Sequence, residues 1–212
     1  MATVHLTIGN RRYSSWSLRG WLALRLAGLE PETEMIWLDE PGYKELLAAA
    51  GPSATVPVMR LDGQVVWDSL AIGLTLADRF PEAGLWPVDP VLRAEAYAVT
   101  AEMHSSFSAL RGALPMDLGR RGEPRPLDAA VEADIARIVE IWSRPASVDG
   151  PFLFGKASLA DCFFAPVASR LRSYAVPLEG RAAAYAKTLL AWPLFREWEE
   201  AAALETRVIA NP

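Results

Sequence analysis

Two adjacent serines, Ser14 and Ser15, stand where an apolar strand pattern ends and an apolar helix pattern begins, in the stretch RRYSSWSLRGW. One role for them is structural, since a serine hydroxyl can accept a hydrogen bond from a free N–H group at a helix N-terminus. The other role is chemical, because a hydroxyl and the positive end of a helix together stabilise a nearby anion. Which role the serines have depends on the strands and helices that surround them.

Asp68 and Ser69 form a second candidate site, ahead of the apolar run LAIGLTLA. Free N–H groups and a short hydroxyl at a helix N-terminus bind a carboxylate readily. A plain N-cap explains one of these two residues but gives no role to the other. Val56-Pro57 is a third candidate, because proline cannot donate to a sheet and normally lies at a strand start or on an edge.

The elements that must position these residues follow from the spacing of apolar side chains in the first eighty residues. Alternation predicts strands, and a wider apolar stripe predicts helices. Asp62-Gly63 between two short apolar runs predicts an antiparallel hairpin. The predicted order is β-α-β-α-β-β-α, over residues 4–8, 18–26, 33–38, 42–51, the hairpin 56–67, and 68–80. A helix joins the first two strands, so they are expected to be parallel.

Beyond residue 80 the character of the sequence changes. The proline-rich stretch 81–90 is expected to be a linker, and residues 91–212 to be helical. Helices are predicted over 91–114 and 127–142, with a mobile loop between them. Ser158 and Asp161 have the S-x-x-D spacing of a capping box. The expected fold class is therefore an α/β domain with a mixed four-stranded sheet over residues 1–80, followed by an all-helical domain.

The composition narrows the possible partners and the compartment. The chain has 212 residues, 51% of them hydrophobic, which is enough to bury a sizeable core. A net charge of −5 without a strongly basic segment argues against nucleic acid or an anionic membrane as partner. We expect a cytoplasmic protein, because no apolar run approaches about 18 residues. A single cysteine, Cys162, and two distant histidines give no disulfide and no metal-ligand pattern.

The β-α-β-α-β-β-α order, with a proline opening the third strand, resembles the thioredoxin fold. Such a domain followed by a helical one resembles the cytosolic glutathione transferases. Four features carry the resemblance, which covers essentially the whole chain and is nearest in motif to the serine-type zeta and tau-like classes. They are Ser14 five residues before Arg19, Val56-Pro57, Asp68-Ser69, and the capping box at Ser158.

The resemblance implies glutathione as co-substrate and assigns each candidate residue a role. Ser14, or Ser15 in its place, would hold the glutathione sulfur as a thiolate. Val56, before a cis Pro57, would pair with the cysteinyl part through its backbone. Ser69 would take the γ-glutamyl carboxylate, and Asp68 the ammonium group. A small hydrophobic electrophile towards the helical domain and a homodimer are also implied.

The energy needed for this activation is modest. Lowering a thiol pKa by about two units takes about 2.7 kcal/mol. One hydrogen bond to a charged acceptor contributes about 1.5–3 kcal/mol, and the positive end of a helix adds about 0.3–2 kcal/mol. One hydroxyl at a helix N-terminus is therefore enough, without a general base.

Alternatives remain open at this point. The SSC triplet of the class that isomerises maleylacetoacetate reads Ser14-Ser15-Trp16 here, so a glutathione-dependent cis–trans isomerase is the second interpretation. A non-catalytic glutathione-binding protein is the third. Tyr13 is the second choice for contact with the thiol, and His104 is either a surface residue or part of the electrophile site.

Overall fold

The structure is a computed structural model that describes residues 4–144 and 149–209. Its sheet contains four strands: β1 (Val4–Gly9), β2 (Glu32–Ile36), β3 (Val58–Leu61) and β4 (Gln64–Trp67). They lie in the order β2-β1-β3-β4, with β1 and β2 parallel and the other two pairs antiparallel. This is the mixed sheet that the sequence predicted.

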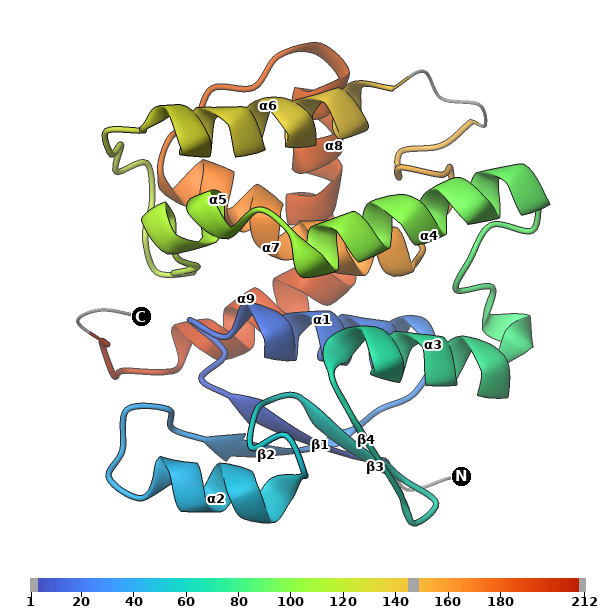
Figure 1. Cartoon of the computed structure of the whole chain (residues 1–212), viewed down its shortest axis with the longest axis vertical. Coiled ribbons are helices and arrows are strands. Elements are labelled where there is room, and N and C mark those ends of the chain that lie inside the picture. Colours follow the sequence, from blue (N-terminus) through green and yellow to red (C-terminus); the bar gives the residue numbers. More distant parts are fainter. Residues whose placement is uncertain (1–3, 145–148, 210–212) are drawn as a thin grey trace.

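Three helices cover this sheet: α1 (Ser15–Leu26), α2 (Tyr43–Ala50) and α3 (Ser69–Arg79). Helices α1 and α3 lie between the sheet and the helical half, whereas α2 covers the opposite face (Figure 1). Leu18, Leu22 and Leu24 of α1 are fully buried because the helix is covered on both sides. Both α1 and α3 begin on the side of the molecule where β1 ends (Figure 1), which brings their N-termini towards one another.

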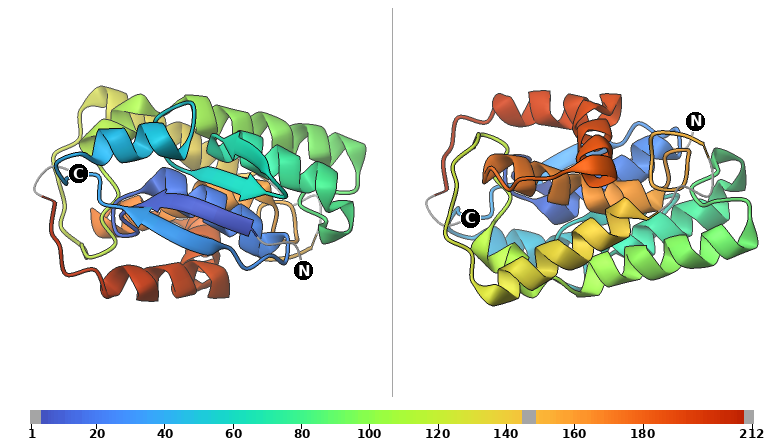
Figure 2. Two further views of the ribbon diagram at one scale, coloured as in Figure 1. Left: turned by 90° about the horizontal axis from the view of Figure 1, so that it is seen from below. Right: turned by 90° about the horizontal axis from the view of Figure 1, so that it is seen from above.

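The second half of the chain begins with a short 3-10 helix, η1 (Pro81–Ala83), inside the predicted linker. The α-helices that follow are α4 (Pro90–Ser105), α5 (Ser108–Ala113), α6 (Ala129–Ser143), α7 (Leu159–Ser173), α8 (Gly180–Ala191) and α9 (Pro193–Ala203). Helices α4 to α8 pack above α1 and α3, with α7 running through their centre, and α9 lies beside α1 (Figures 1 and 2). Within the described residues no helix is both long enough and apolar enough to cross a bilayer.

The prediction of one helix over 91–114 is wrong, because the chain breaks between α4 and α5. Phe107 has a left-handed backbone with φ of 63°, and Ser106 is extended. Serines compete for backbone hydrogen bonds, and the Ser105 hydroxyl donates to the carbonyl of Ala101 at 2.9 Å. The Phe107 ring is buried at the break. The turn lets α5 pack against α6 instead of extending α4.

The predicted capping box at the start of α7 is confirmed. Asp161 is fully buried and accepts from the Ser158 N–H at 2.8 Å, the Ser158 hydroxyl at 2.9 Å and the Tyr185 hydroxyl at 2.6 Å. A buried carboxylate needs such partners, because an unpaired one costs several kcal/mol. Since α7 also contacts α1, this network anchors the wall that faces Ser14 and Ser15.

Candidate active site

Ser14 is the N-cap of α1, and its hydroxyl belongs to a chain of buried polar groups. Its oxygen accepts from the Ser17 N–H at 3.3 Å, and its proton goes to the Ser17 hydroxyl at 2.8 Å. Ser17 also accepts from the Gly9 N–H at 2.9 Å, at the end of β1. Ser14 therefore caps α1, and Ser17 orients its hydroxyl; a cap of this kind is compatible with the chemical role as well.

Ser15 turns towards the helical half rather than along this chain. Its hydroxyl accepts from the Arg170 guanidinium at 3.1 Å. Arg170, on α7, also donates to the carbonyl of Leu114 at 2.6 Å. Burial and the neighbouring Arg111 lower the pKa of Arg170 to about 9, so it is a cation at neutral pH. Ser15 thus holds its proton free for an acceptor while a buried positive charge polarises its oxygen.

Three arginines surround this point without any ion pair among the described residues: Arg19, Arg111 and Arg170. Arg19 is fully buried, and its terminal nitrogens Nη1 and Nη2 have no hydrogen-bond partner. Burial, Arg111 and Arg170 hold the pKa of Arg19 well below its ordinary value, and Asp68 only partly opposes this shift. Unpartnered buried charge is costly. The arrangement leaves a place where an anion would be strongly stabilised.

Trp16 separates two of these cations. The guanidinium carbon of Arg19 lies 4.5 Å from the indole centroid, and that of Arg111 lies 4.6 Å from it. Arg111 otherwise donates to backbone carbonyls at the end of α4, including that of Ser106 at 3.0 Å. A cation over an aromatic face is attracted by the ring quadrupole. The indole therefore holds the two guanidiniums without neutralising them.

His104 connects Trp16 with the second candidate pair. Its ring packs edge-on to Trp16, with centroids 5.4 Å apart, and its Nε2 lies 3.3 Å from a carboxylate oxygen of Asp68. Nδ1 is buried without a partner. Burial lowers the pKa of His104, Asp68 opposes that shift, and Arg19 and Arg111 add to it. His104 thus lies against two residues of the candidate site, Trp16 and Asp68.

Asp68 and Ser69 begin α3 as the sequence predicted. One Asp68 oxygen accepts from the Leu70 N–H at 2.8 Å and from the Ala71 N–H at 3.2 Å. Asp68 has φ of 74°, in the region that non-glycine residues rarely adopt. The Ser69 hydroxyl is buried and has no partner. Capping of α3 explains the role of Asp68 but gives none to Ser69, whose hydroxyl remains available for a ligand.

The Val56-Pro57 peptide bond is cis, as the resemblance implied. Pro57 lies against α1 through Gly20, where an added Cβ would be 2.9 Å from the proline Cγ. Gly20 therefore lets the helix approach the proline, a contact that no sequence pattern indicated. Tyr13, the second choice for the thiol, accepts at its hydroxyl from the Ile209 N–H at 3.1 Å, and burial raises its pKa.

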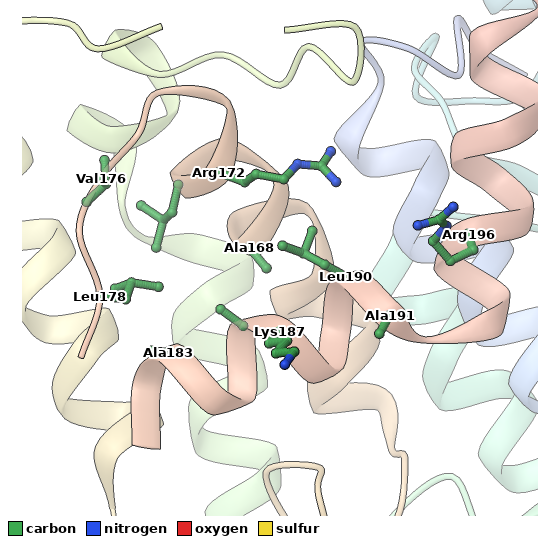
Figure 3. A pocket seen from close by; sticks show the side chains of 11 residues that line it. Ala168, Arg172, Val176, Leu178, Ala183, Lys187, Leu190, Ala191 and Arg196 are labelled. Atoms are coloured by element: carbon green, nitrogen blue, oxygen red, sulfur yellow. The ribbon is translucent and has the colours of Figure 1, made fainter. Parts of the chain in front are cut away.

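A separate cavity of about 400 Å³ lies between α7 and α8. Figure 3 shows its apolar side chains, among them Val176, Leu178 and Leu190, with Arg172 and Lys187 near its edge. None of the residues discussed above lines it. The candidate site is therefore defined by hydroxyls, arginines and helix N-termini rather than by this cavity.

The fold and site define a thioredoxin-like protein with a second helical half and a place for an anion between them. Residues 13–79 match the family model described as glutathione S-transferase, N-terminal domain. Over these residues the chain is similar to a glutathione S-transferase N-terminal domain, which confirms the resemblance seen in the sequence.

Two curated relatives align with part of the chain. A probable maleylacetoacetate isomerase of Caenorhabditis elegans is 34% identical over 113 residues, which are 53% of this chain and 52% of that protein. Protein IN2-1 of Zea mays is 26% identical over 166 residues, 76% of this chain and 63% of that protein. The chain thus spans about half to under two thirds of the length of these relatives.

Solved structures match over nearly the whole chain. A glutathione transferase homolog from Burkholderia GL BGR1 with bound glutathione has a TM-score of 0.74 at 20% identity, covering 95% of this chain and 98% of that one. Maleyl pyruvate isomerase, a bacterial zeta-class glutathione-S-transferase, has a TM-score of 0.73 at 23% identity, covering 96% and 100%. These likenesses confirm the predicted fold class.

The lowered pKa of His104 predicts a pH-dependent stability. The folded protein favours the neutral ring, so the His104 contribution to the unfolding free energy is present above the unfolded pKa of about 6.5 and is lost as pH falls towards the folded value. In His104→Gln we expect urea unfolding midpoints to vary less between about pH 5 and 7 than in the wild type. His5→Gln, on half-exposed His5, is the control. Identical pH profiles in wild type and His104→Gln would contradict the assignment.

Proposed function

We propose that the protein is a glutathione transferase that forms the glutathione thiolate at the N-terminus of α1. The observation that carries the proposal is the group of three arginines, Arg19, Arg111 and Arg170, with no acidic partner in the described residues. At an effective dielectric of about 20, one charge at about 8 Å contributes about 2 kcal/mol. That is close to the free energy needed to keep a thiol ionised at neutral pH. The arginines therefore add to the hydroxyl and the helix end.

The two serines supply the hydrogen bonds to the sulfur. Hydroxyl protons rotate freely. If the Ser17 proton turns to Ser14, the Ser14 oxygen accepts from both the hydroxyl and the N–H of Ser17, which lie 2.8 and 3.3 Å away. The Ser14 proton is then available to the thiolate. Ser15 donates from the other side, with its oxygen held by Arg170. No group has to remove the thiol proton permanently, because solvent takes it.

The rest of glutathione would lie along the first domain. Ser69 offers a buried unpaired hydroxyl at the N-terminus of α3, which suits the γ-glutamyl carboxylate. Asp68 would receive the ammonium group while keeping its contact with His104. The backbone of Val56, before the cis proline, would pair with the cysteinyl part as an added strand does. These assignments place the tripeptide between the starts of α1 and α3.

The electrophile would bear a carboxylate beside an apolar or unsaturated carbon. Trp16 gives a flat apolar surface, and the partly exposed Arg111 gives a charge that fits a carboxylate. The sequence suggested only a hydrophobic electrophile. An apolar surface beside a cation also suits an unsaturated acid, which is the substrate type of the second candidate, a glutathione-dependent cis–trans isomerase. Two of the similar proteins are named as isomerases of maleyl compounds. In that reaction the thiolate adds to the double bond and is expelled after rotation.

A homodimer and a cytoplasmic location remain predictions from the resemblance and the sequence. Large apolar side chains on β4, α3 and α4 are exposed: Trp67 by 44%, Leu74 by 44% and Tyr97 by 46%. Exposed apolar side chains that form a contiguous patch often mark a protein interface, so these three are candidates for contact between two copies.

Ser14→Ala is expected to reduce turnover of an aromatic electrophile by at least about tenfold, since a hydrogen bond to a charged group contributes about 1.5–3 kcal/mol. The glutathione concentration for half-saturation should stay within a few-fold. Steady-state kinetics and the ultraviolet absorbance of the bound thiolate measure both effects. Asp89→Ala is the control, because it removes the N-cap of α4 without touching the site. Loss of turnover in Ser15→Ala but not in Ser14→Ala would move the role to Ser15.

Ser69→Ala is expected to raise the glutathione concentration for half-saturation by about tenfold, the loss of about 1.4 kcal/mol of hydrogen bonding. Its stability should hardly change, because the hydroxyl has no partner in the folded protein. Isothermal titration with glutathione tests the affinity directly. Thr75→Val, which removes another hydroxyl of α3, should bind as the wild type does. Unchanged binding by Ser69→Ala would refute its assignment.

Arg111→Met is expected to raise the half-saturating concentration of a carboxylate-bearing electrophile by about tenfold, since charge-assisted pairs contribute about 1.5–3 kcal/mol. A neutral aromatic electrophile should be affected much less. Arg125→Met is a matched control, because Arg125 also lies over an aromatic ring, Tyr174, and donates to a carbonyl at a helix end, that of Ala113.

The same assay separates the two candidate reactions. Conversion of a cis-dienoic acid without net loss of glutathione selects isomerisation, and equimolar loss of glutathione selects conjugation. An equal effect of Arg111→Met on neutral and anionic electrophiles would contradict carboxylate recognition.

A further inference from the structure

The loop between β1 and α1 carries Ser14, and its backbone N–H groups need partners. Tyr13 and Ser14 donate to the carbonyl of Asn10 at 3.2 and 2.8 Å. Arg11 and Arg12 have no such local acceptor. An N–H group buried without a partner costs free energy comparable to a lost hydrogen bond. The carbonyls of Arg11 and Arg12 accept from the Trp198 indole N–H at 3.0 Å and from the Leu118 N–H at 3.1 Å. The acceptor for the two N–H groups therefore completes the contacts that position this loop.

The acceptor for both groups is Glu205, which follows α9 near the other end of the chain. One carboxylate oxygen accepts from the Arg11 N–H at 2.8 Å, and the other accepts from the Arg12 N–H at 3.2 Å. A carboxylate that bridges two adjacent N–H groups fixes both distances at once, and such charge-assisted bonds are stronger than neutral ones. The contact spans more than 190 residues of sequence.

The segment after α9 contributes little apolar packing of its own. Leu204 is 83% exposed and Val208 is 70% exposed. Its other contacts in the described residues are polar or cation–π: Arg207 pairs with Glu40 at 2.6 Å and lies 4.9 Å from the Trp37 ring centroid, and the Ile209 N–H donates to the Tyr13 hydroxyl. Figure 2 shows the segment passing from α9 towards the edge of the molecule near α2. Polar contacts to the loop, rather than burial, explain why the chain follows this path.

We propose that Glu205 is a positioning residue, which holds the β1–α1 loop so that the Ser14 hydroxyl faces the glutathione sulfur. The inference rests on the proposed function for its effect on catalysis, but its structural part is independent of that function. Glu205 contacts the two N–H groups before Tyr13 and Ser14. It has no contact with Asp68, Ser69 or Val56. Its loss should therefore affect the state of the sulfur and not the binding of the tripeptide.

The test compares Glu205→Ala, Glu205→Gln and Arg207→Ala in the full chain. Arg207→Ala is the matched control, since it removes the contact of the same segment with Glu40 and leaves the loop N–H groups paired. Amide hydrogen exchange at Arg11 and Arg12, followed by NMR without glutathione, should accelerate about tenfold in Glu205→Ala. Glu205→Gln, which keeps one strong acceptor oxygen, should be intermediate, and Arg207→Ala should match the wild type.

The catalytic part is read from kcat, the half-saturating glutathione concentration and the thiolate absorbance. In Glu205→Ala we expect kcat and the thiolate absorbance to fall about fivefold to tenfold, and the glutathione concentration to change less than about twofold. Added acetate should restore part of kcat in Glu205→Ala by accepting from the vacated N–H groups, and should not affect Arg207→Ala. A variant that is only less stable would not lose kcat at an unchanged half-saturating glutathione concentration, and acetate would not rescue it.

The outcomes separate the two proposals. Unchanged exchange at Arg11 and Arg12 in Glu205→Ala overturns the positioning role, whatever the activity. Accelerated exchange with unchanged kcat and thiolate also overturns it, because the loop then does not control Ser14. If the wild type itself forms no thiolate with saturating glutathione, the proposed function fails, and the exchange result still decides the structural part.

Discussion

Positive charge buried without a counter-ion is the constraint on which the site depends. Arg19 is fully buried, and its two terminal nitrogens have no partner in the described residues. Arg111 and Arg170 lie close enough to lower its pKa further. A protein keeps such an arrangement only where the surrounding structure determines it fully. An anion that enters this place pairs with the uncompensated charge, which favours a thiolate or a carboxylate over their neutral forms.

The helical half supplies most of this charge, so its attachment to the sheet is part of the chemistry. Arg170 lies on α7, and Phe163 of the same helix accepts from the Arg19 Nε at 3.2 Å. Helix α7 in turn depends on the buried Asp161, which the capping box and Tyr185 satisfy. A disturbance at this box, far along the chain, would therefore move the charges that face Ser15.

Local patterns predicted much of this structure, and long-range contacts account for what they missed. The strands, the hairpin at Asp62-Gly63, the box at Asp161 and the pair Asp68-Ser69 each leave a signal within a few residues, because caps, turns and alternation are local effects. The break at Phe107 depends on packing of α5 against α6. Arg170 and Glu205 meet Ser15 and Arg11 across more than 150 residues, and a surface arginine or glutamate in a sequence looks no different.

Trp16 illustrates why a residue that departs from a familiar triplet can still fit the site. An acidic residue between Arg19 and Arg111 would neutralise them and remove the attraction for a ligand. The indole contacts both guanidiniums at about the same distance, 4.5 and 4.6 Å. Cation–π attraction of about 0.5–2 kcal/mol per contact offsets part of the desolvation cost but leaves the net charge in place. The aromatic ring thus stabilises the two cations and leaves their charge available to an anion, which the hydroxyls of Ser14 and Ser15 would orient.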